Sequence, residues 1–373
     1  MIIGFDAKSA FHCKRGIGNY SRDTVRILSE YFPDNRYLLF NTDKKNNVQF
    51  PIKDNTKEIL PETSLYKAFP SLWRGRGIKG QIGHEGVEIY HGLSQELPKD
   101  IQHANVKTVV TFHDAIRVRY PELHSKFKNN QLIRRSIHAC KVADKIIAIS
   151  EQTKQDCIDL FGADERKITV VYQGCNNLYR IPVNDSKKEI VKQRYELPPR
   201  YILTVGSIEK RKNAVLIVEA MHRSNLSIPL VIVGKGKSYI DEIKAVAEKY
   251  NLQSQIIFRH NVPLEDLPAI YSLSEIFLFP SLFEGFGIPI LEAMCCGIPV
   301  ITSKGSCFKE TGGDAALYID PYNANELADA IYKVLSDNKV REEMISKGKL
   351  QSDKFTDDKI AQNLMNVYQS FEE

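Results

Sequence analysis

The feature that most constrains the fold of this chain is an alternation of short apolar runs with helix-length amphipathic segments, repeated from one end to the other. The apolar runs, such as residues 1–5, 108–111, 201–205 and 276–279, are rich in Val, Ile, Leu and Phe and too short for helices. Strands that are apolar on both faces belong to parallel sheets that helices cover on both sides. The pattern therefore predicts an α/β fold with parallel sheets.

The length of the chain, 373 residues, predicts two domains at roughly 150 residues each. Residues 173–200 interrupt the alternation, because they lack a helical or strand period and contain several prolines. We therefore place the domain boundary there, with residues 1–180 in the first domain and residues 190–354 in the second. Residues 355–373 carry a single apolar stripe, which predicts one C-terminal helix.

Charge and cysteine content narrow the class of protein. The net charge of +5 is too small to indicate a nucleic-acid partner, although residues 1–180 carry 28 Lys and Arg against 20 Asp and Glu. That excess is either ordinary surface variation or a surface for an anionic membrane or a phosphate-bearing acceptor. The seven cysteines form no C-x-x-C pair, which predicts reduced, mostly buried thiols. Signal-peptide and membrane-span patterns are missing from the sequence, so we expect a cytoplasmic protein.

Residues 279–302 predict a strand end, a glycine loop, a helix and a second strand. Gly285 and Gly287 permit a tight turn, and Pro289 suits the first turn of a helix. Gly297 then ends the helix. The helix N-terminus presents free N–H groups and a partial positive charge to the loop, and this arrangement favours a bound phosphate.

Two carboxylates flank that helix N-terminus, Glu284 in the loop and Glu292 within the helix. Apolar residues surround Glu292 in the sequence, so its carboxylate needs hydrogen-bond donors. The hydroxyl groups of a sugar or a ribose would supply them, because an ionised carboxylate only accepts hydrogen bonds. The alternative interpretation is a pair of solvated surface glutamates.

Two further sets of residues lie where predicted strands end. The loop after residues 201–205 contains Lys210, Arg211 and Lys212, which repel one another unless an anion lies between them. A solvated basic turn is the alternative. His113 follows residues 108–111 directly, and ligands of doubly wound sheets bind beyond the carboxyl ends of strands. A structural histidine is the alternative there, and His91 is a weaker candidate of the same kind.

Two other glycine loops match nucleotide-binding motifs incompletely. Gly16 and Gly18 follow a predicted strand, but the third glycine of a dinucleotide fingerprint is missing. The G-K-G-K-S segment at Gly234–Ser238 lacks the first glycine of a phosphate-binding loop, because Val231 occupies that position. Neither loop predicts a function by itself.

Glu284 and Glu292 stand eight positions apart in E-G-F-G-I-P-I-L-E, and the A-M-x-x-G-x-P-V-I that follows agrees with the same pattern. This segment resembles the E-x7-E motif of glycosyltransferase family 4, whose members are retaining, nucleotide-sugar-dependent enzymes. The resemblance extends over nearly the whole chain. It implies the GT-B fold: two Rossmann-like domains whose parallel sheets face a deep cleft, with residues 1–180 binding the acceptor and residues 190–354 the donor. The helix within residues 355–373 would cross back to the N-terminal domain.

The resemblance also implies roles for individual residues. His113, in T-F-H-D, and Glu284 would be catalytic and lie beside the donor sugar. The R-K-N segment resembles the family's diphosphate clamp, but Ser207 stands where other members carry an arginine, which leaves open which side chain makes the bidentate contact. The residues implied in donor binding are Gly16, Arg211, Lys212, Val262, Gly285, Phe286, Gly287, Ile288 and Glu292, of which Glu292 would hold the ribose and Val262 the base.

The implied reaction is the transfer of a hexosyl group, with retention, from a nucleotide diphosphate sugar to a glycan or lipid-linked saccharide acceptor. The sequence contains no D-x-D pair, so neither a metal nor another cofactor is expected. Likeness to mannosyl-transferring relatives favours GDP-mannose as the donor. A UDP- or dTDP-sugar donor and a non-catalytic nucleotide-sugar-binding protein remain the alternatives.

One stretch of the N-terminal half has the composition of a membrane interface. Residues 65–81 interleave aromatic with basic side chains: Tyr66, Phe69 and Trp73 with Lys67, Arg74, Arg76 and Lys79. The alternative is an ordinary helix with Trp73 in the core. Because the resemblance puts this stretch beside the acceptor cleft, a lipid-carried acceptor at the cytoplasmic face of the membrane is a hypothesis that it suggests.

Overall fold

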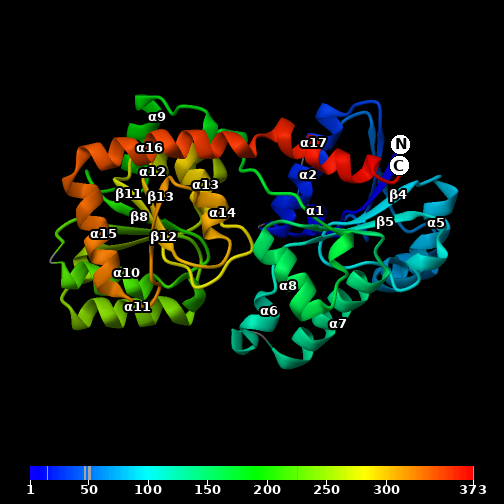
Figure 1. Cartoon of the computed structure of the whole chain (residues 1–373), viewed down its shortest axis with the longest axis horizontal. Helices are drawn as coiled ribbons and strands as arrows, with labels where there is room; N and C mark the ends of the chain where they lie inside the picture. Colours follow the sequence, from blue (N-terminus) through cyan, green and yellow to red (C-terminus); the bar gives the residue numbers. More distant parts are fainter. Residues whose placement is uncertain (15, 46–47, 49–51, 124, 225, 373) are drawn as a thin grey trace. The chain divides into compact units, whose positions relative to one another are not determined.

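The protein is described by a computed structural model that covers residues 1–14, 16–45, 48, 52–123, 125–224 and 226–372. The chain divides into two compact units. Unit 1 comprises Met1–Gln173 and Thr356–Glu373, and unit 2 comprises Gly174–Phe355. Each unit contains one parallel β-sheet with helices packed against it (Figure 1), which confirms the predicted class of two Rossmann-like α/β domains.

The sheet of unit 1 has seven strands in the order β3-β2-β1-β4-β5-β6-β7, and every pair of neighbours is parallel. The chain reverses its direction of winding between β1 and β4, so the carboxyl ends of these two strands flank a topological switch point. The strands are β1 (Ile2–Asp6), β2 (Arg36–Phe40), β3 (Thr56–Ile59), β4 (Ile89–Gly92), β5 (Lys107–Phe112), β6 (Lys145–Ala148) and β7 (Ile168–Val170).

Helices cover both faces of this sheet (Figure 1). One face carries α2 with α1 and the C-terminal helix α17, whereas α5, α7 and α8 contribute to an apolar core on the other. An ion pair of 2.9 Å between Arg26 Nη2 and Asp357 Oδ2 joins α2 to α17, so the C-terminal helix belongs to the N-terminal unit. The helices are α1 (Lys8–His12), α2 (Ile17–Tyr31), α3 (Ser64–Ala68), α4 (Pro70–Leu72), α5 (Ile78–His84), α6 (Ile116–Arg119), α7 (Lys126–Val142), α8 (Glu151–Phe161) and α17 (Asp357–Gln369).

The sheet of unit 2 has six strands in the order β10-β9-β8-β11-β12-β13, again with parallel neighbours. Its switch point lies between β8 and β11, and the segments that follow these two strands carry all the predicted donor-binding residues except Gly16 and Val262. The strands are β8 (Ile202–Val205), β9 (Leu230–Val233), β10 (Ile256–Arg259), β11 (Ile276–Phe279), β12 (Val300–Ser303) and β13 (Ala316–Ile319).

The helices of unit 2 form two groups. The first group, α10, α11 and α15, shares an apolar core with the strands, and α9, α12, α13 and α16 pack against one another in the second. None of the helices among the described residues combines the length and apolar composition that a membrane span requires. The helices are α9 (Asp185–Arg194), α10 (Ala214–Arg223), α11 (Ser238–Lys249), α12 (Leu267–Ser272), α13 (Ile288–Cys295), α14 (Phe308–Gly312), α15 (Ala324–Ser336) and α16 (Asn338–Ser352).

Two elements differ from the sequence-based expectation. The segment 173–200, predicted to lack regular structure, contains α9, which buries only Val191 and therefore shows little apolar periodicity. Strand β3 was not anticipated, because T-K-E-I is largely polar and pairs on one side only, with β2, at the edge of the sheet. Both elements have too few buried positions to produce a pattern in the sequence.

Candidate functional site

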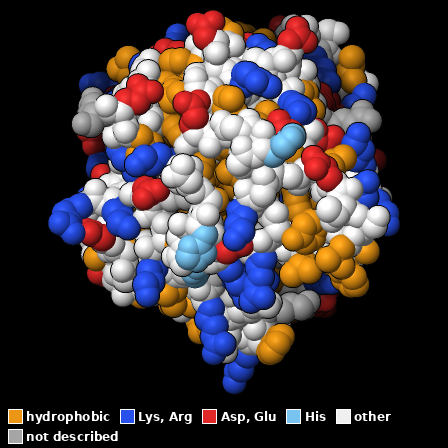
Figure 2. Space-filling view, turned by 90° about the vertical axis from the view of Figure 1, so that its right-hand side faces the viewer, with side chains coloured by type: hydrophobic (Ala, Val, Ile, Leu, Met, Phe, Trp, Pro, Cys, Tyr) orange, Lys and Arg blue, Asp and Glu red, His pale blue; other side chains and the backbone are white. Residues whose placement is uncertain are grey.

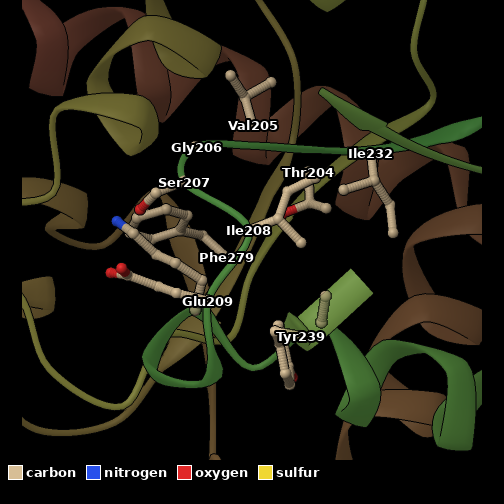
Figure 3. A pocket seen from close by; sticks show the side chains of 11 residues that line it. Thr204, Val205, Gly206, Ser207, Ile208, Glu209, Ile232, Tyr239 and Phe279 are labelled. Atoms are coloured by element: carbon tan, nitrogen blue, oxygen red, sulfur yellow. The ribbon is translucent and has the colours of Figure 1, made fainter. Parts of the chain in front are cut away.

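The predicted donor-binding residues of unit 2, apart from Val262, lie where β8 and β11 end. These strands are neighbours, so the loop that carries Arg211 and Lys212 lies beside the glycine loop before α13. A pocket lies under the first of these loops (Figure 3). In Figure 3, Ser207 and Glu209 lie on one side of this loop and Ile232 and Tyr239 on the other. The pocket is lined by Thr204, Val205, Gly206, Ser207, Ile208, Glu209, Lys212, Ala214, Ile232, Tyr239 and Phe279.

The glycine loop after β11 leads directly into the N-terminus of α13. Gly287 is the N-cap with φ +91°, a left-handed conformation that favours glycine, and a Cβ there would approach Ile290 Cδ1 to 3.2 Å. Pro289 lies in the first turn, as predicted. Phe286 is buried, and its ring packs edge-on against Phe355 with 5.4 Å between ring centroids. The loop is therefore held by apolar packing at the N-terminus of α13.

Glu284 is the centre of a charged cluster. Three donors converge on its Oε1: Lys212 Nζ at 2.5 Å, Arg211 Nη1 at 2.7 Å and Ser281 Oγ at 2.5 Å. Burial by itself would raise the pKa of Glu284, but the charges of Lys212 and Arg211 outweigh it and lower the pKa below its usual value. Glu284 is therefore ionised at neutral pH, and the two cations lie on one side of it.

Both cations are fixed by further contacts. Arg211 donates from Nη1 to the Phe283 carbonyl at 2.6 Å and from Nη2 to Glu209 Oε1 at 2.6 Å. The Lys212 ammonium lies 4.6 Å from the centroid of the Phe279 ring. Glu209 is 43% exposed at its side chain, so its contact with Arg211 is open to exchange for a stronger anion.

Glu292 has a different environment on α13. Tyr271 donates from its hydroxyl to Glu292 Oε2 at 2.8 Å. The nearby Tyr179 hydroxyl also lowers the pKa of this carboxylate. Burial raises the pKa of Glu292 to about 7, and the two tyrosines and Lys212 oppose that rise. Lys212 therefore acts electrostatically on both glutamates, and the structure brings Arg211, Lys212, Glu284 and Glu292 together as the sequence suggested.

The loop after β10, expected to line a nucleotide base, is also within unit 2. Val262 is half-buried there, and it follows Asn261, which has a positive φ of 56°. His260 donates from Nδ1 to the Gly234 carbonyl at 2.5 Å, which ties this loop to the one after β9. Val262 follows β10, which is an edge strand of the sheet and lies two strands from β8.

The predicted catalytic histidine belongs to unit 1. His113 directly follows β5, is buried, and donates from Nε2 to the Leu93 carbonyl at 2.8 Å, so Nδ1 carries the lone pair. Burial lowers the pKa of His113 to about 4, so the ring is neutral at pH 7. Tyr20 packs edge-on against it at 4.6 Å, and Tyr20 lies on α2, whose N-cap is Gly16 with φ +45°. The Gly16 helix and His113 are thus neighbours.

His91 is a structural residue, which corrects its candidacy as a functional one. It is fully buried and hydrogen-bonds Tyr368 of α17 through Nδ1 at 2.7 Å and Thr111 through Nε2 at 2.8 Å. Burial lowers its pKa to about 3. His91 therefore fastens the C-terminal helix to the sheet of unit 1.

Two residues of the aromatic and basic stretch 65–81 are also structural. Trp73 is 1% exposed and donates from Nε1 to Gln81 at 2.5 Å, as the core alternative predicted. Arg74 is only 15% exposed, and its guanidinium pairs with Asp6 Oδ2 at 2.6 Å and Glu96 Oε2 at 2.8 Å. Arg74 therefore cannot contribute to an exposed basic surface, which corrects that part of the membrane hypothesis.

Three site residues were missed at the level of the sequence: Ser281, Tyr179 and Tyr271. Ser281 stands three positions before Glu284, and its position after a predicted strand end was a usable signal. Tyr179 is more than one hundred residues from Glu292 in the chain, and Tyr271 lies on a short helix before β11. No spacing rule connects either tyrosine with Glu292.

Family models and known proteins match this chain over both of its units. Residues 185–351 match the family model "Glycosyl transferases group 1", and residues 59–177 match "Glycosyltransferase Family 4". The O-antigen chain mannosyltransferase B of Escherichia coli is 30% identical over 285 residues, which cover 75% of this chain and 74% of that protein.

Solved structures share the fold. Sucrose-phosphate synthase from Thermosynechococcus elongatus superimposes with a TM-score of 0.80 at 20% identity and covers 100% of this chain and 99% of its own. HepE of Anabaena, in complex with UDP, gives a TM-score of 0.76 at 18% identity with 99% of each chain covered. At these identities the two structures establish the fold alone.

Proposed function

Because this chain belongs to glycosyltransferase family 4, we propose that it transfers a mannosyl group from GDP-mannose to a saccharide acceptor with retention of the anomeric configuration. The observation that carries the proposal is the convergence of Arg211 and Lys212 on Glu284 beside the N-terminus of α13. Mannose as the sugar is supported by the name of the E. coli relative.

The chemical demand of the reaction is to stabilise the diphosphate that leaves while the sugar becomes oxocarbenium-like. Arg211 and Lys212 supply two positive charges, and the N-terminus of α13 adds the partial positive charge of its helix dipole. In the structure three donors share a single oxygen of Glu284. A diphosphate would offer additional acceptors to the two cations, so donor binding relieves this crowding.

The two glutamates then have separate tasks. Glu284, ionised and anchored, accepts hydrogen bonds from the sugar hydroxyls or stabilises the positive charge that develops on the ring. Glu292 accepts hydrogen bonds from the ribose hydroxyls of the nucleotide. In unit 1, neutral His113 presents an Nδ1 lone pair that accepts from a sugar hydroxyl.

Release of nucleoside diphosphate tests the central proposal. Wild type should release GDP from GDP-mannose much faster in the presence of a mannose-terminated oligosaccharide acceptor, and Glu284→Ala should abolish that acceptor-dependent release. Glu265→Ala, an exposed glutamate of the same unit, is the control and should behave as wild type. Unchanged turnover in Glu284→Ala contradicts the proposal.

Donor identity has its own test. A thermal-shift series with GDP, UDP and dTDP should give the largest stabilisation with GDP. A larger shift with UDP would reassign the donor to a UDP-sugar, which the UDP complex of the structurally similar HepE makes the first alternative. Binding of a nucleotide sugar without turnover on any acceptor would favour the non-catalytic alternative.

Retention and metal independence are also parts of the proposal. Arg211 and Lys212 would supply at the leaving group the positive charge that a metal supplies in other glycosyltransferases. Activity should persist in excess EDTA, and proton NMR of the first product should show the anomeric configuration of the donor. Loss of activity in EDTA that Mn²⁺ or Mg²⁺ restores contradicts the metal-independent part alone.

An acceptor carried by a membrane lipid is the last part of the proposal. Three large apolar residues of this segment are exposed: Leu65 of α3 by 56%, Leu72 of α4 by 43%, and Phe69, which joins the two helices, by 59%. Lys67 lies in the same segment. Figure 2 views unit 1 from the side on which Figure 1 labels α5, and it shows hydrophobic side chains exposed among Lys and Arg. Such a surface binds anionic interfaces.

Vesicle co-sedimentation tests this surface. The protein should sediment with vesicles of phosphatidylglycerol more than with phosphatidylcholine, and Phe69→Ser with Lys67→Glu should remove the difference. Arg166→Glu reverses a charge on unit 1 at a side chain that is 89% exposed, and it should have no effect. Equal sedimentation of all variants contradicts a role for this surface.

A further inference from the structure

The carboxylate of Glu292 is held by two tyrosines from two other elements. Tyr271 comes from α12 and donates to Oε2 at 2.8 Å. Tyr179 comes from the 3₁₀-helix η5 (Asn177–Arg180), and its hydroxyl also favours the ionised form of Glu292. An ionised carboxylate has about four lone-pair positions on its two oxygens, so two tyrosine donors leave room for the hydroxyls of a vicinal diol.

Both tyrosines are rigid. Tyr271 is fully buried, and its ring lies 5.2 Å from Phe277 and 5.7 Å, edge-on, from Tyr179. Tyr179 is also buried, and its backbone carbonyl accepts from Cys296 Sγ at 3.7 Å. The two hydroxyl groups therefore have fixed positions, and they restrict the orientation of the carboxylate that accepts from them.

We propose that Tyr271 and Tyr179 are positioning residues for the donor nucleotide: they favour the ionised form of the Glu292 carboxylate and keep it in one orientation, in which it accepts the ribose hydroxyls. The inference rests on the proposed role of Glu292 toward the ribose. It adds that nucleotide affinity depends on the protonation of this carboxylate and that the tyrosines set the pH at which it changes.

The physical reason is a balance of two effects. Burial favours the neutral acid and raises the pKa of Glu292 to about 7, whereas hydroxyl donors favour the carboxylate. Removing one hydroxyl therefore moves the protonation to higher pH. A protonated Glu292 uses one oxygen as a donor and accepts the ribose diol poorly.

Lys212 and three cysteines also interact electrostatically with Glu292. Lys212 favours the carboxylate from its loop, and it is cationic throughout the range of interest. The pKa values of the Cys175 and Cys296 thiols are raised, chiefly by a hydrogen bond to Cys295 and by burial respectively, so both stay neutral near pH 7. The pKa of Cys295 is lowered, chiefly by its hydrogen bond with Cys175, whose sulfur lies 3.3 Å away. Cys295→Ser is therefore a necessary control.

The experiment is isothermal titration of the whole chain with GDP, and with UDP in parallel, between about pH 5.5 and pH 8.5. The variants are Tyr271→Phe, Tyr179→Phe and Glu292→Gln. Tyr201→Phe is the matched control, because the Tyr201 hydroxyl is equally buried in unit 2 but donates to the Ile270 carbonyl at 2.5 Å. The terminal phosphate of the nucleotide titrates near pH 6, so the readout is the difference between variants.

Nucleotide affinity should fall at low pH as Glu292 becomes protonated, and we call this part of the pH profile its acid limb. We expect Tyr271→Phe to shift the acid limb to higher pH by about one unit, so that Kd near pH 7 rises roughly 3- to 10-fold. Above about pH 8.5 the variant should recover most of the wild-type affinity, because Glu292 is then ionised without the hydroxyl. Tyr179→Phe should behave alike. Tyr201→Phe and Cys295→Ser should keep the wild-type limb, and adding Tyr271→Phe to Glu292→Gln should change nothing further.

Two failures can be told apart. If Glu292→Gln binds both nucleotides like wild type near pH 8, the proposed role of Glu292 fails, and this inference fails with it. If Glu292→Gln weakens binding but Tyr271→Phe and Tyr179→Phe keep the wild-type limb, the role of Glu292 stands and the positioning role is wrong. A loss of affinity in Tyr271→Phe that is constant with pH indicates a structural effect and also overturns the inference.

Discussion

The surroundings of Glu284 and Glu292 show how two identical side chains, eight positions apart, acquire opposite properties. Burial by itself would raise the pKa of both carboxyl groups. Around Glu284 the partners are full charges, Arg211 and Lys212, and they lower its pKa below the usual value. Around Glu292 the nearest partners are neutral hydroxyl groups, and its pKa stays near 7. The comparison teaches that the charge of a partner, more than the depth of burial, decides whether a buried carboxylate is ionised.

The largest expected effect comes from neutralising the two glutamates in turn. Glu284→Gln should lower kcat by about 100- to 1000-fold, because the reacting sugar loses a charged partner. It should leave GDP affinity unchanged or tighter, since it removes the anion that competes with the diphosphate for Arg211 and Lys212. Glu292→Gln should show the reverse, with weaker GDP binding and a smaller change in kcat. Steady-state kinetics and calorimetry measure both, and the same pattern in both variants contradicts the division of roles.

Lys212→Met should make the surroundings of Glu284 resemble those of Glu292. GDP affinity should fall roughly 10- to 100-fold, since a charge-assisted contact is lost, and the pKa of Glu284 should rise. Lys210→Met is the control, because the Lys210 side chain is 68% exposed and pairs with Glu242 at 3.3 Å. Equal losses in the two variants would mean that net charge alone attracts the nucleotide.

The two glutamates should affect stability with opposite signs of pH dependence. The folded-state pKa of Glu292 lies above its ordinary value, so the folded state holds this proton more tightly and ionisation destabilises it as pH rises toward 7 and above. Glu292→Gln should therefore be more stable than wild type by about 1 to 3 kcal/mol at pH 8 and nearly equal to it at pH 5.

For Glu284 the sign is reversed. Its folded-state pKa is lowered, so its contribution is present above the ordinary carboxyl pKa and is lost as pH falls through the lowered value. Glu284→Gln should be less stable than wild type at neutral pH and approach it in acid. Hydrogen exchange of unit 2 over a pH series measures both, while fluorescence of Trp73, the sole tryptophan, follows unit 1 as an internal reference.

The smallest expected effect is that of Ser281→Ala. This change removes one of the three donors to Glu284 Oε1 and leaves both cations in place. We expect kcat to fall about 2- to 5-fold and stability by about 1 kcal/mol. Ser303→Ala is the matched control, since the buried Ser303 hydroxyl has no hydrogen-bond partner among the described residues. A larger loss in the Ser303 variant contradicts the assigned hydrogen bond.

Sequence patterns predicted the parts of this protein that local chemistry determines. Gly287 and Pro289 predict the loop and the start of α13 because each restricts its own backbone conformation. The apolar runs predict the parallel strands, since their composition follows from burial on both faces. The edge strand β3 and the helix α9 escaped prediction because few of their residues are buried.

The roles of individual polar residues were harder to predict. His91 and His113 both occur near the ends of predicted strands, yet one fastens α17 to the sheet and the other lies beside Tyr20 and the Gly16 helix. Arg74 looked like a surface cation, but Asp6 and Glu96 neutralise it. Their partners come from distant parts of the chain, and no local spacing encodes those contacts.

Local sequence patterns were enough to predict that this chain forms two parallel α/β domains and that Glu284 and Glu292 flank the N-terminus of one short helix. Those properties depend on hydrophobic period, glycine and proline, which act within a few residues. That Glu284 lies against cations and Glu292 against Tyr179 and Tyr271 follows from contacts between distant segments of the chain. The order of the strands sets which loops become neighbours, and the electrostatic state of each carboxylate follows from those neighbours.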